Sequence, residues 1–356
     1  MIAKSQIWHW LTRSLLAGGL LLLAACSEDS EEQMNGNRLQ LLSATRASGA
    51  YPLGTGDYLL KMYIVPATSE GTMKIADYSY SSSLESPKWT LSSQASISEE
   101  TQYFIYGYMR TDENTIQDSK VNVSAPDGGY ASGINITMRD LPAITDDDIC
   151  LVVGVQRVSN PDVGNTNRVC DPEVLEEGKY GYFSGVAGEN YVNLLMDHLY
   201  SQLVLKFTVD ADYSKLRKIK LKELKLTAAE TVTAKVNIRS NSGIGSPTYT
   251  PGSSTKAWPI FSDEGGVELG ASPSVTDLTA IYCAPGIFST ETTLVSIYDV
   301  YDRQGNLIRE GCTATNKFSI GGMDHGVKKT LTLTVVPTYL YVLGDPDLDN
   351  PTVKFN

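Results

Sequence analysis

The sequence predicts an all-β protein, and three observations carry that prediction. The chain of 356 residues contains 20 Tyr and 30 Gly together with many Thr, Ser and Val, a composition that favours strands and turns. Several segments alternate apolar and polar residues with the period of two that half-buried strands require. Gly, Pro, Asn and Asp turns separate these segments at short intervals, which indicates an all-β sandwich.

The first 25 residues have the features of a secretory signal peptide that is removed from the mature chain. Lys4 and Arg13 supply the positive region, and the apolar run at 15–23 is too short to anchor the chain across a bilayer. The run leads into Leu-Ala-Ala-Cys26, which resembles the bacterial lipobox. In a lipobox the cysteine is acylated with a fatty acid such as palmitate and becomes the new N-terminus. An ordinary signal peptide with an incidental cysteine is the alternative.

An acidic tether, Ser27 to Glu32, follows Cys26 directly. It resembles the export signal that sends lipoproteins of the Bacteroidetes to the outer face of the outer membrane. We therefore expect a surface-exposed lipoprotein of the cell outer membrane, held by lipid rather than by a helix.

Charge and composition exclude several classes of function. The mature chain keeps 27 basic and 41 acidic residues, a net charge of −14, which argues against nucleic acid and against a polybasic membrane surface. Two histidines remain, so we expect neither a His-rich metal site nor any cofactor. No nucleophile–base set is visible, so we expect no enzyme. The acidic runs Asp146–Asp148 and Asp345–Asn350 could hold Ca²⁺, but polar turns explain them better.

The predicted strands can be placed in order along the chain. They cover residues 57–65, 89–91, 102–109, 133–138, 150–155, 199–209, 219–226, 231–238, 294–300 and 331–336. In 219–226 the apolar residues change face after Glu223, which predicts a β-bulge. Only residues 171–178, with Pro near the start and Gly at the end, read as a short helix. His198, which precedes a strong strand, is expected to be structural.

The length suggests two domains, with a boundary in the turn-rich stretch 184–196. We expect a first domain over 47–195 and a second over 196–356.

Four cysteines remain once Cys26 is used for lipid. An even number in an oxidising compartment permits two disulfides, and three connectivities are possible. Pairing within each half, Cys150 with Cys170 and Cys283 with Cys312, is the first choice. Four buried free thiols are the alternative.

Both ends of the mature chain contain short candidate strands. Leu39 and Leu41 share a face in a segment bounded by Arg38 and Arg46, so a trypsin-like cut after Arg46 would remove lipid and strand together. Near the other end Leu331, Leu333 and Val335 share a face, and Pro337 permits an edge position or a bend but not a central strand.

These ends, with a mid-chain segment, resemble the fimbrillin family of Bacteroidetes type V pilins. The resemblance rests on the lipobox, on Thr45-Arg46-Ala47, on Asp197-His198-Leu199 leading into residues 203–207, and on the β-rich C-terminus. It implies two transthyretin-like β-sandwich domains after a cleaved lipoprotein leader. It also implies cleavage by an Arg-specific protease between Arg46 and Ala47.

In that family a strand from a neighbouring subunit fills the groove that the cut strand leaves. The resemblance assigns the acidic tether and the removable strand to residues 26–46. It assigns the donor strand to residues 331–343, which include Leu331, Leu333 and Val335. The expected function is a structural subunit of a surface fimbria, polymerised head to tail with copies of itself or related pilins and supporting adhesion. Arg38 competes with Arg46 as the cut, and the donor limits stay open.

Two alternatives remain. One is a surface glycan-binding lipoprotein, for which Tyr51, Tyr58, Tyr63, Tyr78 and Tyr80 would form an exposed aromatic platform. The other is a pilus anchor or tip subunit rather than a shaft pilin.

Overall fold

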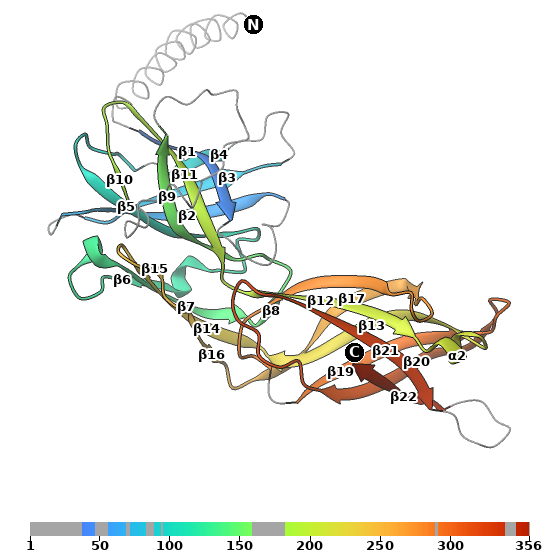
Figure 1. Cartoon of the computed structure of the whole chain (residues 1–356). Coiled ribbons are helices and arrows are strands. Elements are labelled where there is room, and N and C mark those ends of the chain that lie inside the picture. The colour runs from blue at the N-terminus through green and yellow to red at the C-terminus, as the bar shows by residue number, and fades with distance from the viewer. Residues whose placement is uncertain are drawn as a thin grey trace, which may run out of the picture.

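The computed structural model describes residues 38–46, 56–68, 72–82, 89–93, 95–158, 182–288, 291–338 and 347–355. Within these ranges the elements are strands, apart from the single-turn helix α2 (Ala211–Ser214) and the 3₁₀ turns η1 (Asp118–Lys120) and η2 (Tyr130–Ser132). The all-β prediction is confirmed. Figure 1 shows two lobes, with the N-terminal strands in the upper lobe and the C-terminal strands in the lower one.

The upper lobe contains two sheets. In spatial order, sheet A consists of β1 (Arg38–Arg46), β11 (Glu189–His198), β9 (Cys150–Val158), β5 (Gln102–Arg110), β2 (Tyr58–Pro66), β3 (Lys74–Tyr80) and β4 (Trp89–Ser93), with β10 (Tyr182–Ser184) on β5. Sheet B consists of β15 (Gly243–Ile244), β14 (Thr231–Arg239), β7 (Gly133–Pro142) and β6 (Val121–Ser124), with β16 (Thr248–Pro251) on β14.

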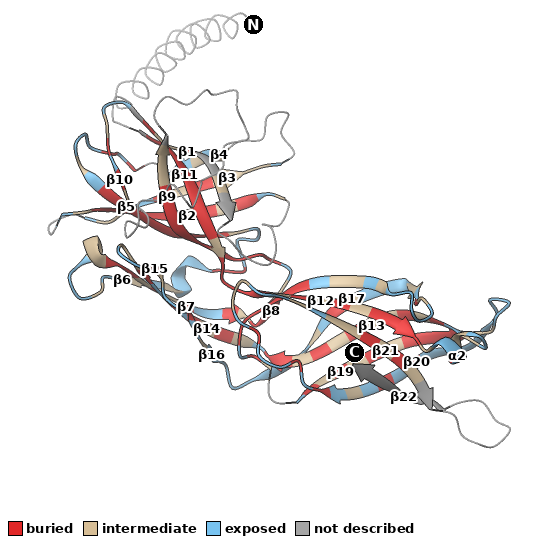
Figure 2. Cartoon of the chain, in the orientation of Figure 1, coloured by how far each residue is buried: buried red, intermediate tan, exposed pale blue. Residues whose placement is uncertain are grey.

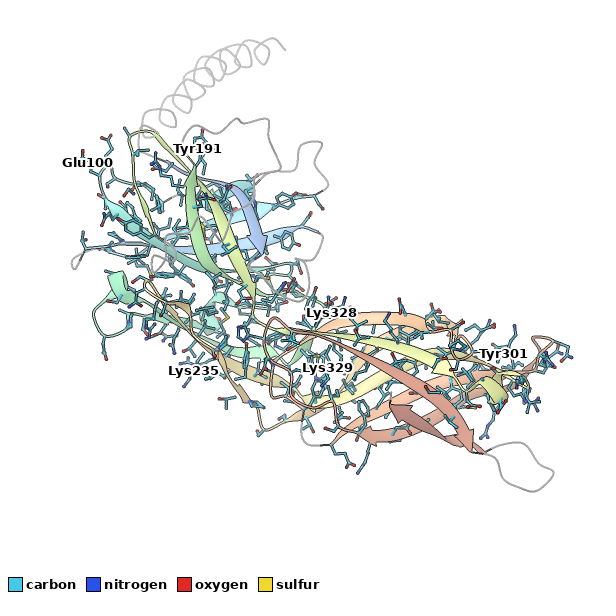
Figure 3. All side chains as sticks on the ribbon, in the orientation of Figure 1. Glu100, Tyr191, Lys235, Tyr301, Lys328 and Lys329 are labelled. Atoms are coloured by element: carbon cyan, nitrogen blue, oxygen red, sulfur yellow. The ribbon has the colours of Figure 1, made fainter. Side chains whose placement is uncertain are left out.

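The lower lobe contains the other two sheets. Sheet C runs β22 (Asp347–Phe355), β21 (Lys328–Thr338), β12 (Ser201–Val209), β18 (Thr276–Cys283) and β8 (Ile144–Thr145). Sheet D runs β17 (Thr255–Glu268), β13 (Lys218–Ala229), β19 (Thr292–Tyr301) and β20 (Leu307–Phe318). In Figure 3, Lys328 at the start of β21 lies at the junction of the lobes, and Tyr301 lies toward the far end of the lower lobe.

Two apolar cores hold these sheets together. One face of sheet A encloses a core of its own, which includes Leu39 of β1, Met62 of β2 and Met196 of β11. Because Tyr78 of β3 donates a hydrogen bond to the Leu39 carbonyl of β1, the two ends of sheet A fold toward each other. The second core is continuous from the other face of sheet A through sheet B into the lower lobe, and Figure 2 shows buried residues along most of these strands.

The bulge predicted in 219–226 is present. The register of β13 against both β17 and β19 shifts between Leu221 and Glu223. The shift returns Leu224 and Leu226 to the buried side that Leu221 occupies, so apolar residues before and after it all reach the core.

The stretch 184–196 does not consist of turns. It contains most of β11, which lies between β1 and β9 in sheet A. Its Asn190 and Asn193 read as turn residues, yet both are buried within the strand. Strands from both sides of residue 195 also share sheet B, where β14 pairs with β7. The domain limits 47–195 and 196–356 therefore stay a prediction.

Candidate functional site at the two terminal strands

β1 lies at the edge of sheet A and pairs with β11 alone. The pairing is parallel and runs from Arg38 opposite Glu189 to Arg46 opposite Met196, with one register shift between Leu41 and Ser43. The strand predicted between the two arginines is therefore present over its whole length. Because β1 has a single ladder partner, it can leave without separating any other pair of strands.

The inward face of β1 is deeply buried. Leu39 is 1% exposed and Leu41 is 6% exposed, and both pack in the core enclosed by sheet A. The Tyr78 hydroxyl, itself buried, donates to the Leu39 carbonyl at 2.7 Å from the opposite end of the sheet. Burial of each leucine stabilises the fold by about 1.5–3 kcal/mol. Departure of β1 would expose this core and the hydrogen-bonding edge of β11.

The predicted processing residues lie at the limits of this strand. β1 ends at Arg46 and begins at Arg38, so both candidate cuts border it. Ala47 and the lipidation residue Cys26 lie outside the described residues. Lipidation at Cys26 and cleavage between Arg46 and Ala47 stay predictions.

The predicted donor residues lie in β21, which is not an edge strand. It pairs in parallel with β12 and antiparallel with β22. Leu333 and Val335 are buried, and Leu331 is half-buried. The ladder to β22 is irregular between Val336 and Thr338, so Pro337 stands at a bend. β22 pairs with β21 alone and forms the edge of sheet C.

Among the described cysteines, Cys283 does not form the expected disulfide with Cys312. The expected pair of Cys150 with Cys170 stays a prediction. Cys150 and Cys283 are buried free thiols, Cys312 is buried, and Cys170 lies outside the described residues. Each of the three lies in an apolar core, where a small side chain packs without a disulfide partner. The alternative of buried free thiols describes Cys150 and Cys283.

The aromatic platform considered for glycans is not on the surface. Tyr58, Tyr63 and Tyr78 are each less than 9% exposed because they point into the cores on either side of β2 and β3. Tyr80 is half-buried and packs against Trp89 at a centroid distance of 5.3 Å. Tyr51 lies outside the described residues.

In the acidic run at 146–148, the Asp147 and Asp148 carboxylates contact other residues of the chain. The buried Asp147 carboxylate accepts hydrogen bonds from the backbone N–H and hydroxyl of Thr111, at 2.6 and 2.7 Å, and from the Asp112 N–H. The neighbouring Asp148 carboxylate contacts the His198 imidazole. The Asp147 carboxylate therefore organises the turn at Thr111 and Asp112, as expected of a polar turn, and the Asp148 carboxylate links the loop before β9 to His198 of β11.

No described helix has the length and apolar character needed to cross a membrane.

No family model matches the chain, and no curated protein matches its sequence. Solved structures do resemble it. One is a fimbrial protein from Bacteroides vulgatus, with 12% identity, a TM-score of 0.41, and coverage of 90% of this chain and 98% of that one.

Another is the fimbrial anchor protein Mfa2 from Porphyromonas gingivalis, with 10% identity, a TM-score of 0.32, and coverage of 90% and 95%. Fimbrial proteins of Bacteroides and Porphyromonas are thus among the solved structures to which this chain is similar.

Proposed function

We propose that the chain is a structural subunit of a surface fimbria that polymerises by donor-strand exchange and supports adhesion. It is exported as a lipoprotein acylated on Cys26 and then cut after Arg46 by an Arg-specific protease. The single observation that carries the proposal is the position of β1. It is an edge strand with a buried apolar face, and it ends at Arg46, the predicted cleavage residue.

Removal of β1 creates a strong acceptor. The edge of β11 loses the ladder partners that β1 supplied, and the apolar groove beneath Leu39 and Leu41 opens to water. A strand that alternates apolar and polar residues restores both, because it pairs with the edge and buries every second side chain. The exchange replaces one strand by another and leaves the rest of sheet A in place.

The donor is proposed to come from the C-terminal strand pair, β21 and β22. β22 is the edge member and can separate first. β21, with Leu331, Leu333 and Val335, becomes an edge strand once β22 has left, and its alternating face then matches the groove. Exchange that used β21 itself would also separate it from β12, so β22 has the lower barrier.

The placement of the two ends favours a filament. β1 lies in the upper lobe, and β21 and β22 lie in the lower lobe (Figure 1). A contact between the lower lobe of one copy and the upper lobe of the next uses two different surfaces. Such a head-to-tail contact produces an open polymer when its rotation does not close into a ring.

The proposal is tested with the purified mature chain and an Arg-specific protease. We expect cleavage after Arg46, loss of residues 26–46, and growth of ladders that resist dilution, read by size-exclusion chromatography and electron microscopy. The matched controls are Arg46→Ala, which should stay monomeric, and Arg38→Ala, which should polymerise like wild type.

A third variant identifies the donor. A chain that ends before β22, at residue 346, should be cut normally and stay monomeric if β22 is the donor. Polymers of the uncut chain, or of Arg46→Ala, would contradict strand removal as the trigger.

A further inference from the structure

A buried cluster of three metal-ligating side chains lies at the end of sheet A nearest the lower lobe. Cys150 is the first residue of β9 and His198 is the last residue of β11, and the two stand directly opposite each other in the antiparallel ladder. Asp148 precedes Cys150 by two residues and reaches the same place. The ligand atoms of these three side chains all lie within 4.8 Å of one another, and no other described group of three or more His, Cys, Asp or Glu residues meets this criterion.

The three ligand atoms are close together and excluded from solvent. His198 Nδ1 lies 2.7 Å from Asp148 Oδ1 and 3.4 Å from Cys150 Sγ, and the sulfur lies 3.6 Å from the same carboxylate oxygen. Exposure is 0% for Cys150 and His198 and 2% for Asp148. Burial, and then the adjacent Asp148 carboxylate, raises the pKa of the Cys150 thiol.

These distances are near those of a tetrahedral zinc site. Zinc binds imidazole nitrogen and carboxylate oxygen at about 2.0–2.1 Å and thiolate sulfur at about 2.3 Å. Tetrahedral angles then place sulfur about 3.5 Å from either other ligand, and nitrogen about 3.3 Å from oxygen. The two distances to sulfur, 3.4 and 3.6 Å, already agree. Only the hydrogen-bonded N–O pair at 2.7 Å would have to open, by about 0.6 Å.

A second observation concerns Tyr58 at the start of β2. The residue is 8% exposed, and its hydroxyl has no hydrogen-bond partner among the described residues. Tyr58 packs in the same core as Cys150. Leu60, two residues further along β2, pairs with Met109 of β5, which in turn pairs with Cys150. Burial, and then the charges of Asp148 and Cys150, raises the pKa of the Tyr58 hydroxyl. A buried polar oxygen without a partner is costly, so the core beside Cys150 contains a polar group that a further ligand could satisfy.

We propose that Asp148, Cys150 and His198 bind one divalent cation of the borderline-soft class, of which Zn²⁺ is the representative. The Cys150 thiol proton leaves to solvent, and His198 coordinates through Nδ1 as its Nε2–H tautomer. The two positive charges offset the carboxylate and the thiolate, so the occupied site is neutral inside the core.

A cation bound at this site would stabilise sheet A next to β1. Arg46 of β1 pairs with Met196, two residues before His198 in β11. A cation that ties His198 to Cys150 would fasten β11 to β9 where β1 ends. The inference does not depend on fimbrial assembly, because it concerns a site formed by β9, β11 and the loop before β9.

The test uses the mature chain carrying Cys26→Ser, so that the N-terminal thiol cannot bind metal, refolded with Co²⁺ as a spectroscopic substitute for zinc. We expect one Co²⁺ per chain, the near-ultraviolet band of a thiolate–cobalt bond, and the visible bands of tetrahedral cobalt, all displaced by Zn²⁺. Cys150→Ser should remove the thiolate band, and His198→Gln should weaken binding by about 100-fold or more. Cys283→Ser, which alters another buried thiol, should change neither.

Two results would overturn the site. One is a folded wild-type chain that shows no thiolate band after refolding with Co²⁺. The other is equal loss of the band in Cys283→Ser. A measurement on the wild type alone guards against variants that do not fold: excess Zn²⁺ should raise its unfolding temperature and excess Mg²⁺ should not, and equal effects of the two ions would also contradict the proposal.

Discussion

Replacing Tyr78 by Phe should destabilise the uncut chain and leave the cut chain unaffected. In the uncut chain the Tyr78 hydroxyl is buried and donates to the Leu39 carbonyl at 2.7 Å. Tyr78 is 4% exposed and Leu39 is 1% exposed, so water cannot replace the lost donor. A neutral hydrogen bond contributes about 1 kcal/mol net, and a carbonyl left without a donor in a dry site adds to the loss. We expect the free energy of unfolding to fall by about 1–2 kcal/mol.

After cleavage and release of residues 38–46, the acceptor is gone and the hydroxyl faces the open groove. The same substitution should then change the free energy of unfolding by less than about 0.5 kcal/mol. Urea unfolding of four species forms a double-mutant cycle that isolates the contact. The species are the unsubstituted chain and Tyr78→Phe, each uncut and cut, and all four end at residue 346 so that the cut chains stay monomeric with the groove open. An equal loss in the cut and uncut chains would refute the assignment of Tyr78 to β1.

Five further variants test the packing and the polar contacts of the fold. Leu39→Ala should lower the free energy of unfolding of the uncut chain by about 2–3 kcal/mol, measured by urea unfolding, because the leucine is buried in the core of sheet A; an effect below about 0.5 kcal/mol would contradict the burial of β1. Asp147→Ala should cost about 1.5–3 kcal/mol by the same assay, since it removes the charged acceptor of the Thr111 and Asp112 N–H groups, whereas Asp147→Asn should cost less because an amide oxygen still accepts. Gly107→Ala should lower the melting temperature sharply, since its Cβ would stand 2.1 Å from the Lys61 carbonyl oxygen, while Gly322→Ala, with nothing within 4 Å, should not.

Local pattern was sufficient for the strands that alternate strongly. The bulge near Glu223 could be predicted because the apolar residues on either side of it must face one core. Residues 199–209 were likewise predicted as a strand, and in β12 the alternate residues Leu203, Leu205 and Phe207 are buried in the core. In both cases the side-chain period alone determines the orientation of the strand.

β11 was missed because its signal is non-local. Its asparagines favour turns in isolation, but Asn190 is buried and satisfied by the backbone of residues 186 and 188. Its other edge is covered by β1, more than 140 residues away in the sequence. Propensity cannot register a strand whose stability comes from two distant neighbours.

The metal-ligating cluster could not be predicted for the same reason. Cys150 and His198 are separated by 48 residues, and only the register of β9 against β11 places them opposite each other. The one local signal was the spacing of Asp148 and Cys150, which puts two ligands on one face of an extended segment. That spacing is common in polar turns and gave no reason to expect a site.

The measurement that most directly tests the account is the intact mass and N-terminal sequence of the protein released from the surface of its native host. We predict an N-terminus at Ala47 and no lipid, because residues 26–46 leave with β1 before the groove is filled. A protein that carries acylated Cys26 on every copy would contradict removal of β1, and would assign the chain to a pilus anchor or to a glycan-binding surface lipoprotein.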